Sequence, residues 1–294
     1  MKIKGIILAG GYGTRLYPMT LGISKQLLPV YDKPMIYYPL SVLMISGIKD
    51  ILIISSNSDI SNYKSLLDDG KKLGINISYE VQDKPNGIAE SLIIASKFIG
   101  DDNICLILGD NIFYGKKLNF YLEKAKHNLD IGYSTIFGAL VNNPEDFGVI
   151  SFDKKNKITR ITEKPNKPDS KIIVSGLYFY TNNVIKIANQ LKPSKRGELE
   201  ITDVNNKILS KNKLRVVKLD DKIKWVDTGT YNSLLKASKF FHDIEKNEGT
   251  KFACIEQIAF EMGYINEIQL QHIAKSMQNS EYGKYIFNLL KNGI

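Results

Sequence analysis

Hydrophobic residues recur in two patterns along the first 130 residues. Short apolar runs, which are typical of buried strands, alternate with longer segments whose apolar positions follow helical spacing. The strands are expected at 3–8, 51–55, 75–81 and 104–108, and the helices at 35–46, 59–69, 88–99 and 118–127. Gly47, Gly70 and Gly100 follow three of these helices, where a terminating glycine is expected. Such alternation predicts a mostly parallel sheet with helices on both faces.

The pattern changes at Gly132. Strand-like segments that alternate apolar with polar residues are expected at 132–140, 147–153, 157–162 and 172–180, and we expect them to add antiparallel strands. Helical patterns return at 231–246, 254–262, 267–277 and 282–290. The predicted fold class is therefore α/β, a doubly wound, Rossmann-like mixed sheet. One domain is expected over 1–240, with halves 1–130 and 131–240, and a helical extension over 241–294.

Three glycines follow the first predicted strand, in the stretch Leu8-Ala9-Gly10-Gly11-Tyr12-Gly13-Thr14-Arg15-Leu16. Glycine lets the backbone turn through positive φ and approach a ligand closely, and free N–H groups on such a turn bind anions. Arg15 and Lys25 add positive charge nearby. The stretch lacks the third glycine of the dinucleotide fingerprint and the Lys-Ser or Lys-Thr of the P-loop. We therefore predict a site for several phosphates, with an ordinary glycine turn as the alternative.

Two aspartates are candidates for holding a metal ion. Asp110 follows the strand at 104–108, and ligands of parallel sheets bind beyond the carboxyl ends of the strands. Asp227 lies where a strand ends and a helix begins. Mg²⁺ favours carboxylate and phosphate oxygens, so the two side chains can share one ion if they meet at the same sheet edge. A turn residue is the alternative for Asp110, because Gly-Asp-Asn is also good turn chemistry.

Composition and charge exclude several classes of function. The net charge is +9, but only four of the 40 basic residues are arginines and the lysines are spread along the chain, so no nucleic-acid partner is expected. No apolar run reaches the roughly 18 residues that span a bilayer, and no signal peptide precedes the first strand, so we expect a cytoplasmic protein without a membrane partner. Two cysteines are too few for a disulfide framework. The isolated histidines, interpreted as surface or interface residues, are His127, His242 and His272.

The motifs resemble those of the sugar-phosphate nucleotidylyltransferases, and among these the thymidylyltransferases most closely. The resemblance rests on the glycine stretch and on Ser24-Lys25-Gln26-Leu27-Leu28-Pro29, where uridylyl and cytidylyl relatives usually carry Pro-Lys in place of Ser-Lys. It implies a glycosyltransferase A-like nucleotidyltransferase architecture, with Mg²⁺ as cofactor. The implied reaction transfers a thymidylyl group from dTTP to α-D-glucose 1-phosphate, giving dTDP-glucose and pyrophosphate. That reaction is the first step of dTDP-L-rhamnose synthesis for cell-surface polysaccharide.

The same resemblance implies a role for each matching residue. The implied catalytic residues are Arg15, Lys25 and Lys164. The implied nucleotide-binding residues are Leu8, Gly10, Gly11, Gly13, Thr14, Arg15, Lys25, Gln26, Gln82, Gly87 and Asp110. The implied sugar-phosphate-binding residues are Gly148, Glu163, Lys164, Val174, Arg196 and Trp225. The implied metal ligands are Asp110 and Asp227.

Two positions depart from the family pattern, since Phe147 replaces a tyrosine and Tyr264 stands where relatives often have tryptophan. By resemblance, the C-terminal extension serves subunit contact and an effector site, so a homo-oligomer is expected, with a tetramer favoured over a dimer. Two alternatives remain open. One is a glucose-1-phosphate nucleotidylyltransferase that uses UTP, and the other is a sugar-nucleotide binding module without catalytic activity.

Overall fold

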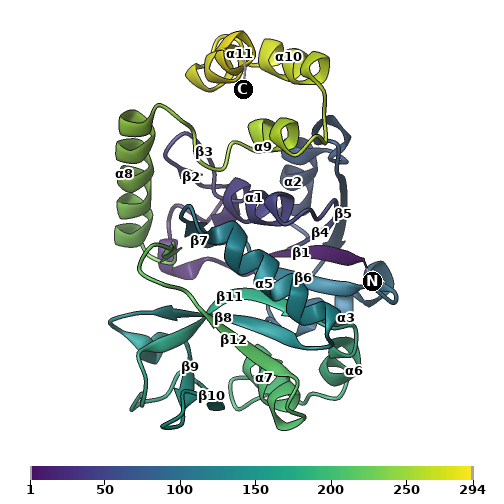
Figure 1. The fold of residues 1–294 in the computed structure, drawn as a ribbon, viewed down its shortest axis with the longest axis vertical. Coiled ribbons are helices and arrows are strands. Elements are labelled where there is room, and N and C mark those ends of the chain that lie inside the picture. The colour runs from purple at the N-terminus through teal and green to yellow at the C-terminus, as the bar shows by residue number, and fades with distance from the viewer. Residues whose placement is uncertain (1, 293–294) are drawn as a thin grey trace.

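A nine-stranded mixed sheet forms the centre of the protein in the computed structural model, which describes residues 2–292 (Figure 1). The strands are hydrogen-bonded in the order β10-β9-β11-β6-β1-β4-β5, and β8 joins β11 to β12. Their bounds are β1 (Ile3–Ala9), β4 (Asp50–Ser55), β5 (Asn76–Val81), β6 (Asn103–Leu108), β8 (Ser134–Leu140), β9 (Gly148–Phe152), β10 (Ile158–Glu163), β11 (Ile172–Tyr180) and β12 (Leu214–Lys218).

The first four of these strands are parallel, as the sequence predicted. β1 lies between β4 and β6, and β5 pairs with the outer side of β4. Leu8 stands opposite Ile54 on one side and Leu108 on the other, so these strands end at one edge of the sheet. β11 then runs antiparallel to β6, and β8 antiparallel to β11. The expected antiparallel additions are therefore confirmed. The unanticipated strand β12 pairs parallel with β8.

Helices cover both faces of the sheet, which confirms the doubly wound fold. Side chains of β1 alternate between two core clusters, with Ile7 in one and Ile6 and Leu8 in the other. α1, α2 and α5 contribute to the first cluster, and α3, α4, α6 and α7 to the second. Their bounds are α1 (Tyr37–Ile45), α2 (Ile60–Leu67), α3 (Glu90–Ile94), α4 (Ser96–Ile99), α5 (Leu118–Asp130), α6 (Val184–Ala188) and α7 (Ile201–Ser210).

Some local predictions were wrong. The segment 88–99 forms two short helices, because Ala95 has ψ near −4° and interrupts the helical ladder. β8 and β11 are buried on both faces, although an alternating pattern was expected. The reason is their place inside the sheet rather than at its edge. Elements that the sequence analysis did not anticipate include β12, α6 and α7.

Two small antiparallel sheets and four short 3-10 turns complete the framework. One small sheet pairs β7 (Asn111–Tyr114) with β13 (Lys224–Asp227), and the other pairs β2 (Pro29–Val30) with β3 (Lys33–Pro34). The 3-10 turns lie at Thr14–Leu16, Lys25–Leu27, Lys71–Leu73 and Pro144–Asp146.

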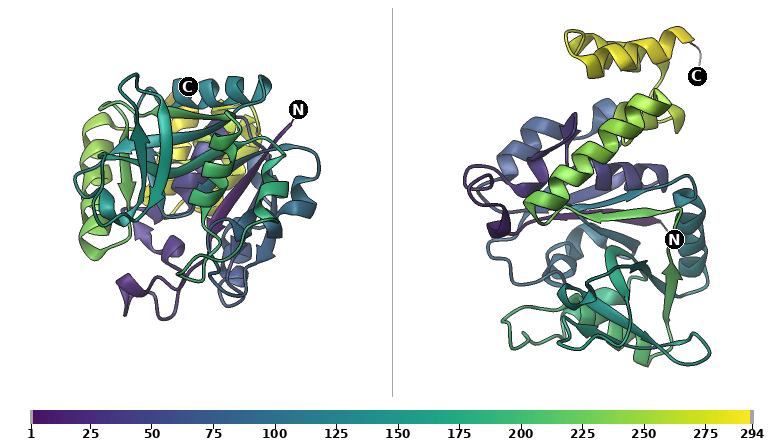
Figure 2. Two further views of the ribbon diagram at one scale, coloured as in Figure 1. Left: turned by 90° about the horizontal axis from the view of Figure 1, so that it is seen from below. Right: turned by 90° about the vertical axis from the view of Figure 1, so that its left-hand side faces the viewer.

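The C-terminal extension is helical, as predicted, and α10 and α11 form one end of the molecule (yellow in Figures 1 and 2). Ile255, Leu270 and Ile286 belong to the same core cluster as Ile7, so the extension packs onto the first half of the domain. The Tyr264 hydroxyl donates a hydrogen bond to the Met44 carbonyl, 2.9 Å away, at the end of α1. The helices of this region are α8 (Tyr231–Glu248), which runs across the expected boundary at 240, α9 (Ile255–Glu261), α10 (Glu267–Ser276) and α11 (Glu281–Asn292).

A buried charge network joins the β2–β3 hairpin to this extension. The Lys33 side chain, only 1% exposed, lies 2.5 Å from Asp32 Oδ1 and 2.9 Å from Glu245 Oε1 of α8. Lys251, between α8 and α9, pairs with the same two carboxylates. Buried charges are tolerated only when they are paired, so each member depends on the others. Within residues 2–292, no helix has the length and apolar character needed to cross a bilayer.

We expect Lys33→Met to lower the free energy of unfolding by about 3–5 kcal/mol, because it leaves the buried Glu245 and the partly buried Asp32 with a single cation. Urea denaturation measures the change. Lys71→Met is the matched control, since Lys71 pairs with Asp69 at an exposed position and should change stability little. A loss for Lys33→Met as small as that of the control would contradict the prediction.

Candidate active site

The glycine turn after β1 forms one wall of a cavity of about 220 Å³. Gly11 and Gly13 have φ of 99° and 59°, a region that favours glycine. Gly10 lies against the side chain of Gln82, since a Cβ at Gly10 would come within 2.8 Å of Gln82 Oε1. The residues that line the cavity are Gly10, Gly11, Gly13, Thr14, Arg15, Leu16, Lys25, Gln26, Asp110 and Gly229. Of these, only Leu16 and Gly229 were not among the predicted site residues.

Lys25 is the central charge of this cavity. It begins the 3-10 turn at Lys25–Leu27 and is only 8% exposed. Its Nζ lies 2.5 Å from Asp110 Oδ2 and 3.9 Å from Asp227 Oδ1. The structure therefore brings the two predicted metal-binding carboxylates to one ammonium group.

The pairing of β7 with β13 explains why the two aspartates meet. Asp110 directly precedes β7, Asp227 ends β13, and Asn111 stands opposite Asp227 in the ladder. Thr228 closes the arrangement, because both its backbone N–H and its Oγ1 donate to the Asp110 carbonyl, at 3.3 and 2.9 Å. The sequence analysis expected a strand before Asp227 but did not anticipate β7, its partner.

The electrostatics of the site disfavour two bare carboxylates. Partial burial, followed by the negative charge of Asp110, raises the pKa of Asp227 above its ordinary value, while Lys25 and Arg15 oppose the shift. A Cβ placed at Gly229 would lie 3.0 Å from Asp227 Oδ1 and 3.5 Å from Arg15 Nη1, so the guanidinium is close to the same carboxylate. Two adjacent carboxylates of this kind favour an added cation.

The donor set fits a hard divalent ion that also takes ligands from a substrate. Mg²⁺ is commonly bound by one or two carboxylates together with substrate phosphates. Asp110 and Asp227 supply the carboxylates, and the glycine turn beside them can accept phosphates. No cluster of three or more histidine, cysteine, aspartate or glutamate side chains suited to a metal occurs within residues 2–292.

A hydrogen-bond network behind the cavity fixes Gln26. The Ser24 hydroxyl donates to Gln26 Oε1 at 2.7 Å, and it also lies 2.7 Å from the hydroxyl of Tyr63, a fully buried residue of α2. The Gln26 Oε1 therefore already accepts a hydrogen bond from Ser24, and the Gln26 amide nitrogen lies 3.5 Å from the Gly10 carbonyl oxygen. The sequence analysis did not single out Tyr63, because nothing local links it to the glycine turn.

Gln82 and Gly87 lie on the neighbouring loop after β5. The Gln82 amide nitrogen donates to Glu90 Oε2 at 2.7 Å and to the Gly87 carbonyl at 3.3 Å. Gly87 has φ of 109°, and a Cβ there would lie 2.4 Å from the Leu199 carbonyl oxygen. The loop is thus held closely against the segment before α7, which leaves no room for a side chain at Gly87.

Four of the predicted sugar-phosphate residues, Gly148, Glu163, Lys164 and Arg196, form a second group around β9 and β10. Glu163 accepts a short hydrogen bond from Thr202 Oγ1 and lies 3.4 Å from Arg196 Nη1. Gly148 is opposite Glu163 in the ladder, which keeps this carboxylate accessible from one side. Arg196 also pairs with Glu198 and Glu200, so its charge is shared among three carboxylates. Lys164 is exposed beside Glu163, with an unusual φ of 39°.

Trp225 links the two groups through Asn111, a residue that the sequence analysis did not assign. The indole Nε1 donates to Asn111 Oδ1 at 2.7 Å and to the Ser175 carbonyl at 2.9 Å. Asn111 Nδ2 in turn donates to Asp110 Oδ1 at 2.9 Å. The ring of Phe147 meets the Trp225 ring edge to face, with 5.5 Å between centroids, so Phe147 serves packing at this position. Asn111 follows directly after Asp110, and this position was the only local sign of its role.

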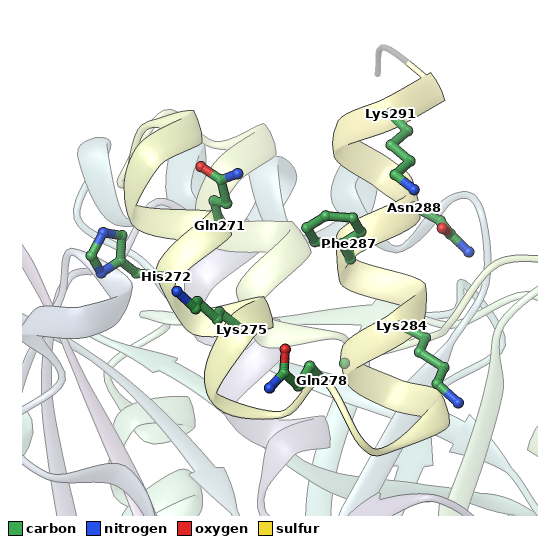
Figure 3. A pocket seen from close by; sticks show the side chains of 9 residues that line it. Gln271, His272, Lys275, Gln278, Lys284, Phe287, Asn288 and Lys291 are labelled. Carbon is green, nitrogen blue, oxygen red and sulfur yellow. The ribbon is translucent and has the colours of Figure 1, made fainter.

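A larger cavity, of about 700 Å³, lies between α10 and α11, far along the chain from the glycine turn (Figure 3). Phe287 points between the two helices, and several lysine and amide side chains surround it (Figure 3). His272 is exposed at this cavity, and His127 and His242 are exposed elsewhere, so none of the three histidines belongs to the site around Lys25.

Comparison with known proteins identifies similar chains over almost the full length. The family described as "Nucleotidyl transferase" matches residues 4–244. A glucose-1-phosphate thymidylyltransferase of Neisseria meningitidis serogroup A is 50% identical over 289 residues, which is 98% of this chain and 100% of the relative. The enzyme of the same name from Xanthomonas campestris pv. campestris strain B100 is 50% identical over 290 residues, covering 99% and 98% of the two chains.

Solved structures agree with this similarity. A Bacillus anthracis crystal structure in complex with a sucrose, assigned there as a glucose-1-phosphate thymidylyltransferase, has a TM-score of 0.75 and 40% identity over 81% of this chain and 94% of that one. A UDP-glucose pyrophosphorylase complexed with UDP-glucose shares the fold, with a TM-score of 0.73 and 24% identity over 83% of this chain and 100% of that one.

We expect Asp227→Asn to stabilise the metal-free protein at neutral pH. Because the folded state raises the pKa of Asp227, it binds this proton more tightly than the unfolded chain does, so stability falls as pH rises above the ordinary value of 3.8. The amide removes that cost, and its advantage should shrink as pH falls toward 3.8. Melting temperatures measured against pH without divalent ions test this.

Asp169→Asn is the control for this measurement. A hydrogen bond from Ser151, together with Arg160, lowers the pKa of Asp169, so this substitution should destabilise the protein at neutral pH. The interpretation of the Asp227 environment fails if both variants shift the melting temperature in the same direction.

Proposed function

The chain belongs to the nucleotidyl transferase family, and on this premise we propose that it transfers a thymidylyl group from dTTP to α-D-glucose 1-phosphate. The products are dTDP-glucose and pyrophosphate. The observation that carries the proposal is the meeting of Lys25, Arg15 and two carboxylates at a glycine turn. The family match and the similar relatives confirm the family that the sequence motifs indicated.

The chemistry needs alignment and charge neutralisation rather than a base. A phosphate oxygen of glucose 1-phosphate, already ionised near neutral pH, attacks the α-phosphorus of dTTP. The new P–O bond forms as the bond from the α-phosphorus to the bridging oxygen breaks, and pyrophosphate leaves with the electron pair. Positioning and electrostatic stabilisation account for most of the catalysis in such reactions.

The cations of the site divide this work by position. Arg15, exposed at the mouth of the cavity, would stabilise the departing pyrophosphate, and Lys25, deep inside, would hold charge near the α-phosphate. Asp110 and Asp227 would hold Mg²⁺, which supplies further neutralisation of phosphate charge when bound. Without a metal, Lys25 lies beside both carboxylates and offsets part of their mutual repulsion.

Specificity would come from the two flanking groups of residues. The Gln82 amide donates its N–H groups to Glu90 and to the Gly87 carbonyl, so its Oε1 would accept from an N–H group on the edge of a pyrimidine, and the Gly87 backbone lies beside it. Glu163 offers carboxylate oxygens for sugar hydroxyls, with Lys164 and Arg196 near the attacking phosphate. Gly148, Val174 and Trp225 would complete the sugar pocket. The loop contacts of Gly87 and the Trp225–Asn111 bond support a preformed site.

The wider setting belongs to the same proposal. The product would enter dTDP-L-rhamnose synthesis for cell-surface polysaccharide, and the protein would work in the cytoplasm. Residues 1–240 would form the catalytic domain, with nucleotide binding in 1–130 and sugar-phosphate binding in 131–240. The extension over 241–294 would make contacts between subunits of a homo-oligomer, with a tetramer favoured over a dimer. The extension shares a hydrophobic core with α1, so a subunit contact made by the extension would be coupled through that core to residues 1–130.

A pyrophosphate-release assay with a panel of nucleoside triphosphates and sugar 1-phosphates tests the activity directly. We expect dTTP with glucose 1-phosphate and Mg²⁺ to give the highest rate, and EDTA to abolish it. A preference for UTP would replace the thymidylyl assignment with the uridylyl one. Binding of dTDP-glucose without any pyrophosphate release would instead indicate a non-catalytic binding module.

Arg15→Ala should lower turnover by about 10³-fold or more, since a single arginine on transferring phosphates contributes roughly 10³–10⁵ in related chemistry. The protein should remain folded, because Arg15 is exposed. Arg160→Ala is the matched control, as Arg160 pairs with Asp169 on β10 and does not line the cavity. Near-normal turnover of Arg15→Ala would refute its assigned role.

A further inference from the structure

A second polar cavity lies at the opposite side of the sheet from β5, beside the edge strand β12. It has a volume of about 640 Å³ and is bounded by α5, β12 and the turn between β9 and β10. Within residues 2–292, β12 pairs with β8 alone, so one edge of this strand is open. Ligand pockets commonly measure about 300–1,000 Å³. No predicted residue of the Lys25 site lines this cavity.

Four cations surround the cavity without carboxylate partners. They are Lys124 of α5, Lys157 of the hairpin, and Arg215 and Lys218 of β12. No carboxylate lines the cavity, and among residues 2–292 none of the four forms a salt bridge. The buried lysines near the Lys25 site and the β2–β3 hairpin, in contrast, are all paired.

Arg215 is held in place by neutral partners. Its Nη1 donates to Asn128 Oδ1 at 2.6 Å, and its guanidinium stacks 4.2 Å from the centroid of the Tyr133 ring. Asn128 is 2% exposed, and its Nδ2 donates to Thr135 Oγ1 at 3.0 Å. A buried amide thus orients the arginine without neutralising it. Arginine has five N–H donors in a planar fork, so others remain for an anion.

Lys218 is positioned in a similar way. Its Nζ lies 3.8 Å from the centroid of the Phe152 ring and 3.4 Å from Asn156 Oδ1. The hairpin turn carries one carboxylate, Asp153, whose Oδ1 accepts the backbone N–H groups of Lys155 and Lys157. The Asp153 carboxylate therefore binds the backbone of its own turn, and it does not line the cavity. Two of the four cations are therefore preorganised by rings and amides, which leaves their positive charge available.

We propose that this cavity is a binding site for a small anion with two or more adjacent phosphate groups, separate from the Lys25 site. Arginine matches phosphate oxygens bidentately, and the lysines add charge-assisted hydrogen bonds. Ile158 and Val216 give the cavity an apolar wall beside the cations. Such a wall would let a ring attached to the phosphates add to the binding. The proposal does not depend on the reaction assigned to the Lys25 site.

Isothermal titration calorimetry with tripolyphosphate at about 0.15 M ionic strength tests the proposal, because salt at this level screens non-specific attraction. The double variant Arg215→Gln/Lys218→Gln should lose one class of binding site or weaken it at least about tenfold. The control Lys64→Gln/Lys97→Gln removes the same charge from exposed positions elsewhere and should bind as the wild type does. Equal binding by both double variants would overturn the proposal.

Asn128→Asp gives an independent measurement. This variant retains every cation but places a carboxylate against Arg215, so binding of tripolyphosphate should also weaken. Unchanged melting temperatures would show that both cavity variants are folded. If Asn128→Asp is folded and binds tripolyphosphate as tightly as the wild type, the arginine does not hold the anion and the proposal fails.

A second titration, with a nucleoside diphosphate, identifies the source of the phosphates. If the double variant loses sites for both probes, the cavity accepts a nucleotide as well as a phosphate chain. If it loses only the tripolyphosphate site, the ligand is an inorganic phosphate chain. Either result supports a polyphosphate site in this cavity, whereas a loss for neither probe refutes it.

Discussion

The ion pairs of Lys25 with Asp110 and Asp227 join three parts of the chain that are far apart in the sequence. A lysine that is almost removed from water must keep its partners, and two adjacent carboxylates repel each other without a cation between them. The small sheet of β7 and β13 sets the two carboxylates side by side, and Thr228 fastens the second to the backbone of the first. The same charges that would bind a metal and phosphates therefore help to hold the ligand-free site together.

The segment that carries Lys25 continues directly into the β2–β3 hairpin, and this gives the C-terminal extension a route to the site. Lys33 of the hairpin is locked by Glu245 of α8, and Lys251 completes the network. Met35 and Ile36 then return hydrogen bonds to Leu28 and Gln26. The contacts of the extension therefore help to position the backbone that carries Lys25 and Gln26.

Charge is organised differently at the two cavities of the sheet. Around Lys25 the cations are balanced by carboxylates. Beside β12 the cations are oriented by Asn128 and aromatic rings, which hold geometry without cancelling charge. The net charge of +9 explains why some cations lack carboxylate partners. It does not explain why Arg215 is oriented by two neutral partners, Asn128 and Tyr133.

The sequence by itself determined the doubly wound sheet, the glycine turn, the helical extension and the family, because these depend on local periodicity and on motifs that are contiguous. It also placed Asp110 at the edge of the sheet where ligands bind, since Asp110 follows directly after a predicted parallel strand. Only the tertiary structure decided that Asp227 reaches Lys25, that Tyr63 supports Gln26 and that Asn111 connects Trp225 to Asp110. These pairings join segments separated by dozens of residues, and strand pairing and burial, which no local pattern encodes, bring them within hydrogen-bonding distance.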